Sequence, residues 1–301
     1  MEIISPSEYP ITTHGFFDIP SDVYHADPCI FPSLSSGIAK NILRSPLHAQ
    51  AKHPRLRLTH DPLEDESSSA MKLGSLIHAL VLGNGPDFAV IDADDYRTKA
   101  ARELRDTALE DGFIPILAKE HAQGEKVSAA VKACIGGLSI GPQFLASAKE
   151  VTGICTMDGS VLRCRCDGLY ADGDGALITD LKSCRDANPA GLGRMMLAYG
   201  YHLQAAFYIA CVGQLLPHLA GRIRFVFIFA EKDPPYAVSC VELDEMGLTL
   251  GSRLFMSALE TWKQCLAKGE WPGYSRDVVS VELPAWALRD IPQDFPEELF
   301  S

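Results

Sequence analysis

Two aspartates and a lysine near the middle of the chain have side chains and a spacing that suit hydrolysis of a phosphodiester. Asp167 lies thirteen residues before Asp180, and Leu181 and Lys182 follow directly. Two carboxylates can hold a hard divalent cation, and an ammonium group can orient water and offset charge on pentavalent phosphorus. An ordinary alternative stays open, because Asp-x-Lys is common and an aspartate after a strand is usually a turn residue.

The residues around this group predict a β-hairpin that would bring its side chains together. Residues 161–170 alternate in polarity with period two, which predicts a strand that carries Asp167. The Asp-Gly-Asp-Gly sequence of residues 172–175 is a strong turn signal, and residues 176–182 predict the returning strand. The aspartate and the lysine of that strand are two positions apart, so they project to the same side. We therefore expect both carboxylates and the ammonium group at one end of a sheet.

Four segments of the chain have counterparts, in the same order, in one known family. Residues 14–50 contain Tyr-His, a serine cluster and Ser-Pro-x-His, and residues 71–83 contain Gly-x-x-x-His. The predicted hairpin carries RCD and ITDLKS, and residues 201–208 contain Gln-x-x-x-Tyr. On these motifs, residues 14–275 resemble the PD-(D/E)xK nuclease superfamily, and most closely its phage-type exodeoxyribonuclease VIII (RecE-like) members.

The resemblance implies an α/β fold with a restriction-endonuclease-like three-layer core, in which a central mixed sheet is flanked by helices. Helices arranged around a hairpin-bearing sheet agree with this architecture. We expect three parts of the chain. They are an N-terminal arm with a short helix packed on the core (residues 1–65), a nuclease core (66–275) and a C-terminal tail (276–301).

Hydrophobic periodicity and capping residues predict the remaining elements. Residues 1–35 lack a helical period and predict an extended arm, and residues 58–70 are polar and acidic, as in a mobile loop. The predicted helices are 37–44 (capped by Ser35 or Ser36 and halted by Pro46), 71–82, one or two within 95–149, 195–212 and 243–268, and residues 223–231 predict a strand.

The resemblance also implies an active site built around one or two Mg²⁺ or Mn²⁺ ions. The implied metal ligands are His78, Asp167, Asp180 and the carbonyl oxygen of Leu181. Lys182 would position the attacking water, and Gln204 and Tyr208, which share a helical face, would contact the scissile phosphate or its neighbours. Core packing is the alternative for these two residues and for His78, because a lone histidine or a polar stripe beside an apolar face usually belongs to the core.

A second group of residues is expected to bind DNA. It comprises Ser33, Ser35, Ser36, Arg44 and Arg165. The serines precede a predicted helix whose first amides are free, and a helix N-terminus attracts phosphate, here that of a 5′-phosphorylated end. Alternatively, the serines only cap the helix, and Arg165 pairs with an aspartate. Glu150, just before the first predicted core strand, is either a further acid near the metals or a surface residue.

The composition is that of an ordinary globular protein. The chain has 301 residues, of which 47% are hydrophobic and 22% charged. No apolar stretch is long enough for a transmembrane helix, and the first ten residues lack the features of a signal peptide. The nine cysteines include no Cys-x-x-Cys pair, which argues against an iron–sulfur cluster and favours reduced thiols. We therefore expect no membrane association and a cytoplasmic protein, and the resemblance implies that it is encoded by a phage or prophage in a bacterial host.

The net charge of −12 argues against DNA binding, because nucleic-acid-binding proteins usually carry a basic surface. An exonuclease that encircles its duplex, however, needs basic residues only along its channel, and acidic charge elsewhere keeps it soluble. The candidate channel residues are Lys40, Arg44, Arg163, Arg165, Arg185 and Arg194.

These observations predict a divalent-metal-dependent DNA exonuclease that resects linear duplex ends. The resemblance implies 5′-to-3′ polarity, double-stranded DNA ends as substrate, a single-strand annealing protein as partner and a homo-oligomeric state. Two alternatives remain: an endonuclease or repair nuclease on the same fold, and a catalytically silent DNA-end-binding phage protein. The intact Asp167, Asp180 and Lys182 argue against the silent protein, because a scaffold has no need of them.

Overall fold

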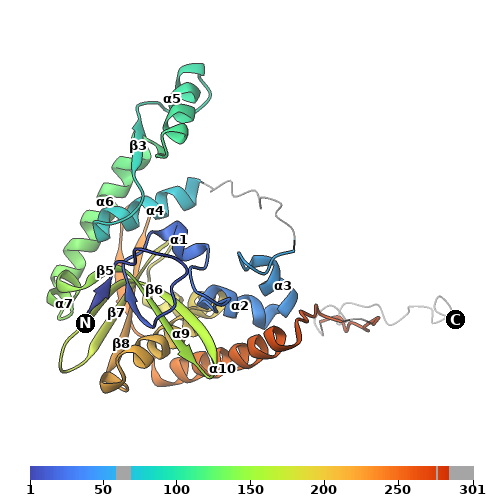
Figure 1. Ribbon diagram of the computed structural model, residues 1–301. Helices are drawn as coiled ribbons and strands as arrows, with labels where there is room; N and C mark the ends of the chain where they lie inside the picture. Colours follow the sequence, from blue (N-terminus) through green and yellow to red (C-terminus); the bar gives the residue numbers. More distant parts are fainter. Residues whose placement is uncertain (59–68, 276, 285–301) are drawn as a thin grey trace, which may run out of the picture.

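A computed structural model describes residues 1–58, 69–275 and 277–284. Its centre is a mixed seven-stranded sheet with the strand order β1-β2-β5-β6-β7-β8-β9, covered by helices on both faces (Figure 1). The strands are β1 (Ile3–Ile4), β2 (Gly15–Phe17), β5 (Ala148–Met157), β6 (Ser160–Ala171), β7 (Ala176–Cys184), β8 (Ile223–Glu231) and β9 (Val238–Val241). The predicted three-layer α/β architecture is therefore confirmed.

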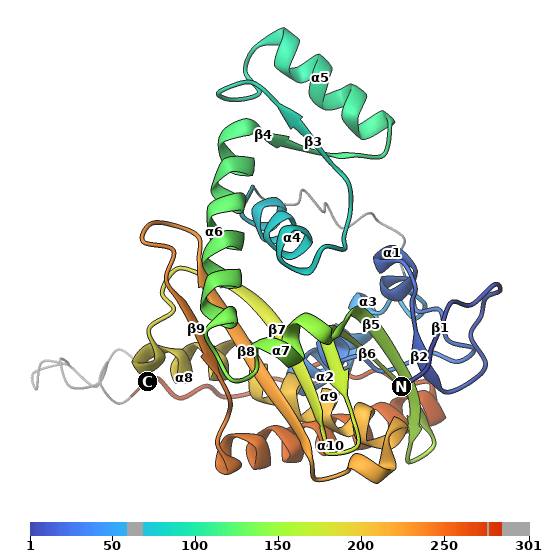
Figure 2. The ribbon, with the colours of Figure 1, turned by 90° about the vertical axis from the view of Figure 1, so that its left-hand side faces the viewer.

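The helices form the two outer layers, which Figure 2 shows above and below the sheet. The helices are α1 (Ser21–His25), α2 (Ser36–Arg44), α3 (Pro46–Lys52), α4 (Ser69–Leu82), α5 (Lys99–Glu110), α6 (Ala118–Gly136), α7 (Gly141–Ala146), α8 (Pro189–Tyr199), α9 (Tyr201–Leu215) and α10 (Glu245–Lys268), with a 3₁₀ turn at Pro217–Leu219. A separate two-stranded parallel sheet, β3 (Phe88–Ile91) with β4 (Ile114–Leu117), projects with α5 from the α4 and α6 layer.

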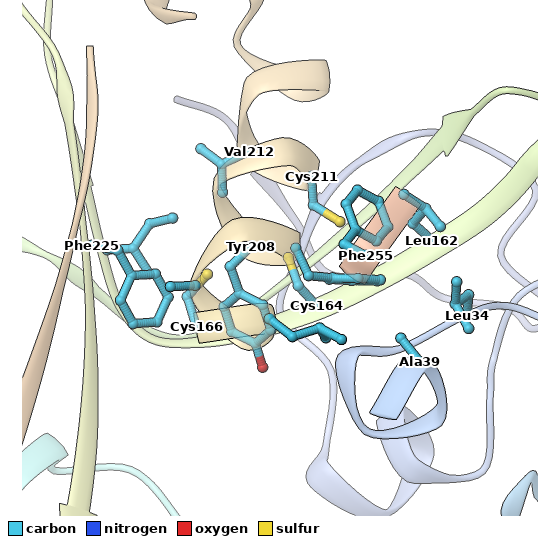
Figure 3. Packing of buried hydrophobic residues seen from close by; sticks show 14 of the residues in the cluster. Leu34, Ala39, Leu162, Cys164, Cys166, Tyr208, Cys211, Val212, Phe225 and Phe255 are labelled. Atoms are coloured by element: carbon cyan, nitrogen blue, oxygen red, sulfur yellow. The ribbon is translucent and has the colours of Figure 1, made fainter. Parts of the chain in front are cut away.

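Strand β8 shows why the sheet is buried on both faces. Phe227 and Phe229 pack in one core with α2, α9 and α10, whereas Ile228 and Ala230 pack in a second core with α4 and α6. Successive side chains of a strand point to opposite faces, so a strand covered on both sides reads as a continuous apolar run. The larger core, seen in Figure 3, joins Leu162 and other residues of β6 to α9. Each face of the sheet thus packs against its own hydrophobic core.

The N-terminal arm contributes strands that the sequence did not predict. β2 pairs antiparallel with β5, and β1 pairs with β2 at the edge of the sheet. Farther along, Leu34 forms a bridge with Leu162 of β6. Ser35 caps α2 by accepting a hydrogen bond from the backbone N–H of Ile38. The predicted end of this helix before Pro46 is also correct, but a second helix, α3, starts at that proline.

The helix predicted at residues 195–212 is two helices in the structure. α8 ends at Tyr199, α9 begins at Tyr201, and the chain bends by 75° at the intervening Gly200, whose φ is 67°. A left-handed φ favours glycine because a Cβ atom would be strained there. In the described part of the chain no single helix is long and apolar enough to cross a membrane. Only α8 and α9, taken together across their bend, have sufficient length and apolar composition.

The other predicted elements are close to those observed. The hairpin strands, the strand at residues 223–231 and the helices at 71–82 and 243–268 are all present, with ends shifted by at most a few residues. Residues 95–149, where one or two helices were predicted, contain three, α5, α6 and α7, together with β4, which was not predicted. Most of the loop expected at residues 58–70 and most of the tail expected at 276–301 lie outside the described residues.

Candidate active site

The sheet divides where the two aspartates of the hairpin lie. β6 and β7 pair only between Gly168–Ala171 and Ala176–Thr179, after which β6 continues beside β5 and β7 beside β8. Asp167 and Asp180 are the first residues past the last pair. We call this opening the fork. The carboxylate Oδ2 of Asp167 accepts a hydrogen bond from the backbone N–H of Leu181 at 2.7 Å, so a side chain spans the gap where the ladder ends.

The backbone on the β5 side of the fork is also irregular. β5 and β6 are in register on both sides of Glu150 and Asp167, with pairs at Lys149 and Val151 of β5, but Glu150 itself is not paired. Glu150 has a φ of 55°. A non-glycine residue in this region costs of order 1–3 kcal/mol and is often found at functional sites. The irregularity turns the Glu150 carboxylate toward the fork.

Three side chains converge on this side of the fork from α4, β5 and β6. One ligand atom from each of His78, Glu150 and Asp167 lies within 4.8 Å of the other two. The His78 Nδ1 atom is 3.5 Å from Asp167 Oδ2. His78 thus lies beside the Asp167 carboxylate, as the sequence predicted, although 89 positions separate the two residues in the chain. Glu150, which the sequence left open, belongs to the same cluster.

The other side of the fork belongs to the α9 layer. Asp180 is 2% exposed, and its Oδ1 atom accepts a hydrogen bond from Nε2 of Gln204 at 2.7 Å. Its Oδ2 atom lies 2.5 Å from the ammonium nitrogen of Lys182. Burial alone would lower the pKa of Lys182, but the carboxylates of Asp180 and Asp167 outweigh burial and raise it above its usual value. Lys182 therefore remains an ammonium group, which can orient water but cannot take a proton from it.

The charges at Asp167 are only partly compensated. Burial raises the pKa of Asp167 to about 6; the imidazole of His78 and the ammonium group of Lys182 oppose this shift, whereas Asp180 and Glu150 add to it. Carboxylates held together in a buried place favour a bound cation, and carboxylate oxygens with an imidazole nitrogen suit Mg²⁺ or, more readily, Mn²⁺. The Leu181 carbonyl fits the same group, because the N–H and C=O of one residue in a strand point to the same edge, here toward Asp167.

Tyr208 lies deeper in the molecule than its predicted role requires. Its side chain is 6% exposed and packs against Phe207 and Phe225 in the larger core, near Cys164 and Cys166 (Figure 3). Burial raises its pKa well above the usual tyrosine value. This position favours core packing over contact with a scissile phosphate. Gln204, one turn earlier, contacts the fork.

Ser33 and Arg163 have structural contacts in place of the predicted contacts with DNA. Ser33 is fully buried, and its hydroxyl and backbone N–H both donate to the Asp27 carboxylate, at 2.6 and 3.0 Å. The guanidinium of Arg163 lies 3.2 Å from the same carboxylate, and Nε2 of His53 lies 3.3 Å from it. Burial alone would raise the pKa of Asp27, but these partners lower it. The expectation that Ser33 binds phosphate therefore does not fit the structure.

Three further residues predicted to bind DNA, Ser35, Arg44 and Arg165, also have partners within the protein. The Ser35 hydroxyl caps α2, and Ser36 is buried in its first turn. The Nε atom of Arg44 donates to the hydroxyl of Tyr274, and the Nε atom of Arg165 donates to Glu150 at 2.6 Å. The partner of Arg165 is thus a glutamate of the fork and not an aspartate. Through Glu150, Arg165 helps to hold the acidic cluster in position.

Two neighbours of the fork were missed as site residues. Lys40 of α2 was considered only as one of six channel cations, and Tyr201 was given no role. In the structure, the ammonium nitrogens of Lys40 and Lys182 lie 5.8 and 5.2 Å from the centre of the same Tyr201 ring. Nothing local in the sequence relates α2 to α9, so this contact could be found only from the fold.

Comparison with known proteins agrees with the fold. The model of a PDDEXK-like domain of unknown function (DUF3799) matches residues 35–283, and no curated protein matches the chain significantly. Among solved structures, a "putative exonuclease" from Eubacterium rectale is 15% identical, with a TM-score of 0.58 over 91% of this chain and 98% of that chain. This likeness shows the fold.

Two further solved structures are less similar. SSO0001 is 14% identical with a TM-score of 0.27, over 64% of this chain and 85% of that chain. LHK-Exo in complex with dAMP is 16% identical with a TM-score of 0.26, over 68% of this chain and 98% of that chain. The family match and the fold together support a nuclease.

Proposed function

Because the chain belongs to the PDDEXK-like domain family, we propose that it is a divalent-metal-dependent DNA exonuclease whose active site is the fork. One observation carries the proposal: an under-compensated cluster of His78, Glu150 and Asp167 faces a buried Asp180–Lys182 pair across a gap in the sheet. The partners in a complete structural ion-pair cluster would lower the pKa of its carboxylate, whereas the pKa of Asp167 stays raised.

Each residue of the fork has a task in this proposal. The divalent cation would be held by His78, Glu150, Asp167, Asp180 and the Leu181 carbonyl. When bound, it would polarise the phosphate and lower the pKa of water. Lys182 keeps its proton, orients the attacking water and offsets the negative charge that develops on the phosphate. Gln204 fixes the orientation of the Asp180 carboxylate through its hydrogen bond.

The finer parts of the proposal are supported by the sequence resemblance to phage-type RecE-like proteins. They are 5′-to-3′ resection of linear duplex ends, a single-stranded product for an annealing protein, a homo-oligomeric state and action in the cytoplasm of a bacterial host. The acidic net charge of −12 fits an enzyme that binds DNA only along a restricted basic path.

The test uses linear duplex DNA labelled at either the 5′ or the 3′ end, together with a covalently closed circle. With Mg²⁺ the protein should shorten the linear substrate progressively from one end and leave the circle intact, and a chelator should stop the reaction. Asp167→Ala and Asp180→Ala should abolish hydrolysis. Asp174→Asn, in the exposed turn of the same hairpin, is the matched control and should retain full activity.

Two results would change the proposal. Cleavage of the closed circle would identify an endonuclease on the same fold. Full activity of either alanine variant, or no Mg²⁺-dependent hydrolysis by the parent protein on any of these substrates, would reject the fork as a nuclease site.

A further inference from the structure

Two tyrosines at the junction of α8 and α9 form a stacked pair next to the fork. The rings of Tyr199 and Tyr201 have centroids 5.7 Å apart and planes inclined by 22°. The Tyr201 ring packs against the rings of Phe227 and Phe229, at centroid distances of 5.6 and 6.0 Å. Tyr199 is 61% exposed. The pair, which we call the tyrosine platform, is thus anchored in the core at one end and open to solvent at the other.

The platform is joined to the fork by two lysines. The ammonium nitrogen of Lys182, which is paired with Asp180, lies 5.2 Å from the Tyr201 ring centre. The ammonium nitrogen of Lys40 lies 5.8 Å from the same centre and donates a hydrogen bond to the Tyr199 carbonyl at 3.2 Å. Both contacts depend on the bend at Gly200, where a Cβ atom would lie 2.8 Å from Cδ of Lys40.

Core packing explains only part of this arrangement. It accounts for Tyr201, which covers two phenylalanines, but not for Tyr199, which presents most of its surface to water. Two ammonium groups near one ring repel each other, and a polyanion along the platform would offset this repulsion. Nucleic acid offers both matching features: phosphates for the lysines and flat bases for the rings. Inside a duplex the base faces are covered by neighbouring pairs, so apart from the terminal pair only unpaired bases can stack on a protein ring.

We propose that the tyrosine platform, together with Lys40, binds unpaired nucleotides next to the scissile phosphate of a DNA strand. This inference rests on the proposed nuclease function and adds to it. The enzyme would grip a single-stranded or frayed end, with a base stacked on Tyr199 and the adjoining phosphate at Lys40, while the scissile phosphate enters the fork.

The test measures binding in the presence of a chelator, so that hydrolysis does not interfere. The probes are a duplex with a short unpaired DNA overhang that carries the fluorescent base 2-aminopurine, and the same duplex with a blunt end. Parent protein should bind the overhang more tightly and quench the fluorescent base. Tyr199→Ala should weaken binding of the overhang by about tenfold and remove the quenching, with little change for the blunt duplex.

Two variants control for indirect effects. Tyr199→Phe keeps the ring and should bind and quench as the parent does. Tyr9→Ala removes a tyrosine that is 48% exposed in the N-terminal arm and should change neither property. Thermal unfolding of each variant should match that of the parent, because exposed side chains contribute little to stability.

Equal affinity and equal quenching for the parent and Tyr199→Ala would overturn the inference, as would tighter binding of the same overhang made of RNA. Such a result would leave the nuclease proposal intact, because Mg²⁺-dependent hydrolysis is measured separately. Conversely, Tyr199-dependent binding without any hydrolysis would reject the nuclease function but keep the single-strand site.

Discussion

The protein contains two clusters built from an acid, a histidine and an arginine, one buried at Asp27 and one half-buried at the fork, and their charges are balanced differently. In the N-terminal cluster, Asp27 accepts two hydrogen bonds from Ser33 and lies beside Arg163 and His53. Burial alone would raise the pKa of Asp27, but its partners outweigh burial and lower it. At the fork, by contrast, burial raises the pKa of Asp167 to about 6, and His78 offsets only part of the shift.

Under the proposed function, this difference separates a structural cluster from a catalytic one. Every partner of Asp27 comes from the chain itself, so this cluster is complete and joins the N-terminal arm to β6. At the fork, Arg165 pairs with Glu150 and Lys182 pairs with Asp180. The pKa of Asp167 nevertheless stays raised, because His78 and Lys182 do not outweigh burial and the two neighbouring carboxylates. Perturbed carboxylates of this kind are typical of catalytic sites.

The largest effect is expected when the fork loses its positive charge. Lys182→Ala should lower the rate of DNA hydrolysis by about 100-fold or more, because it removes the group that stabilises charge on the phosphate. Ser33→Ala, in the N-terminal cluster, should leave the rate per folded molecule unchanged. Single-turnover hydrolysis of end-labelled duplex measures both variants, and equal losses for the two would remove the distinction between the clusters.

Substitution of Asp27 in the N-terminal cluster should lower the stability of the folded protein. Asp27→Ala leaves Arg163 buried without its carboxylate, and breaking such a pair costs about 3 kcal/mol or more of folding free energy. Urea unfolding at neutral pH measures the loss, with Asp22→Ala, an exposed aspartate of α1, as the matched control. Because the pKa of Asp27 is lowered in the folded protein, its contribution should persist at all pH values above about 4. A loss similar to that of the control would contradict this interpretation.

Substitution of Asp167 at the fork should instead raise the stability of the metal-free protein. With a folded pKa of about 6, Asp167 destabilises the metal-free protein as pH rises through that value. Asp167→Asn can keep the hydrogen bond from Leu181 and should raise metal-free stability by about 2 kcal/mol at pH 8, with no gain below pH 4. Added Mn²⁺ should then stabilise only the parent. Destabilisation of the metal-free variant at pH 8 would show that the cluster is already balanced.

The smallest effect on stability is expected from Ser35, the serine that caps α2. Ser35→Ala removes the cap of α2 and should cost about 1 kcal/mol of stability. Rates on 5′-phosphorylated and dephosphorylated ends should change in parallel, because the hydroxyl is already used by the helix. A selective loss on phosphorylated ends would restore the predicted phosphate contact.

The sequence predicted those parts of the site that depend on local pattern. The period-two alternation and the Asp-Gly-Asp-Gly turn identify the hairpin, and the motif order indicates His78 and Gln204. Long-range polar contacts left no such signal. The distances between Asp27, His53 and Arg163 depend on how the arm crosses β6, so the structural role of Ser33 could not be seen in advance.

Backbone geometry limited the prediction in two further places. At Gly200 the apolar pattern continues across the bend, so periodicity alone predicted one helix where the structure has two. Glu150 could not be assigned, because its position depends on a left-handed backbone and on the register of two strands. The hairpin turn indicated that Asp167 and Asp180 meet, but no such local signal relates Glu150 of β5 to Asp167 of β6.

The most direct test of the account is calorimetric titration of the metal-free protein with Mn²⁺ at pH 7.5. The account predicts binding at the fork by the parent, at least about tenfold weaker binding by Asp167→Ala and by Glu150→Gln, and unchanged affinity for Lys182→Ala. Binding by the parent should also weaken as pH falls below 6, where Asp167 takes up a proton. Equal Mn²⁺ affinity for the parent and Asp167→Ala would contradict the account.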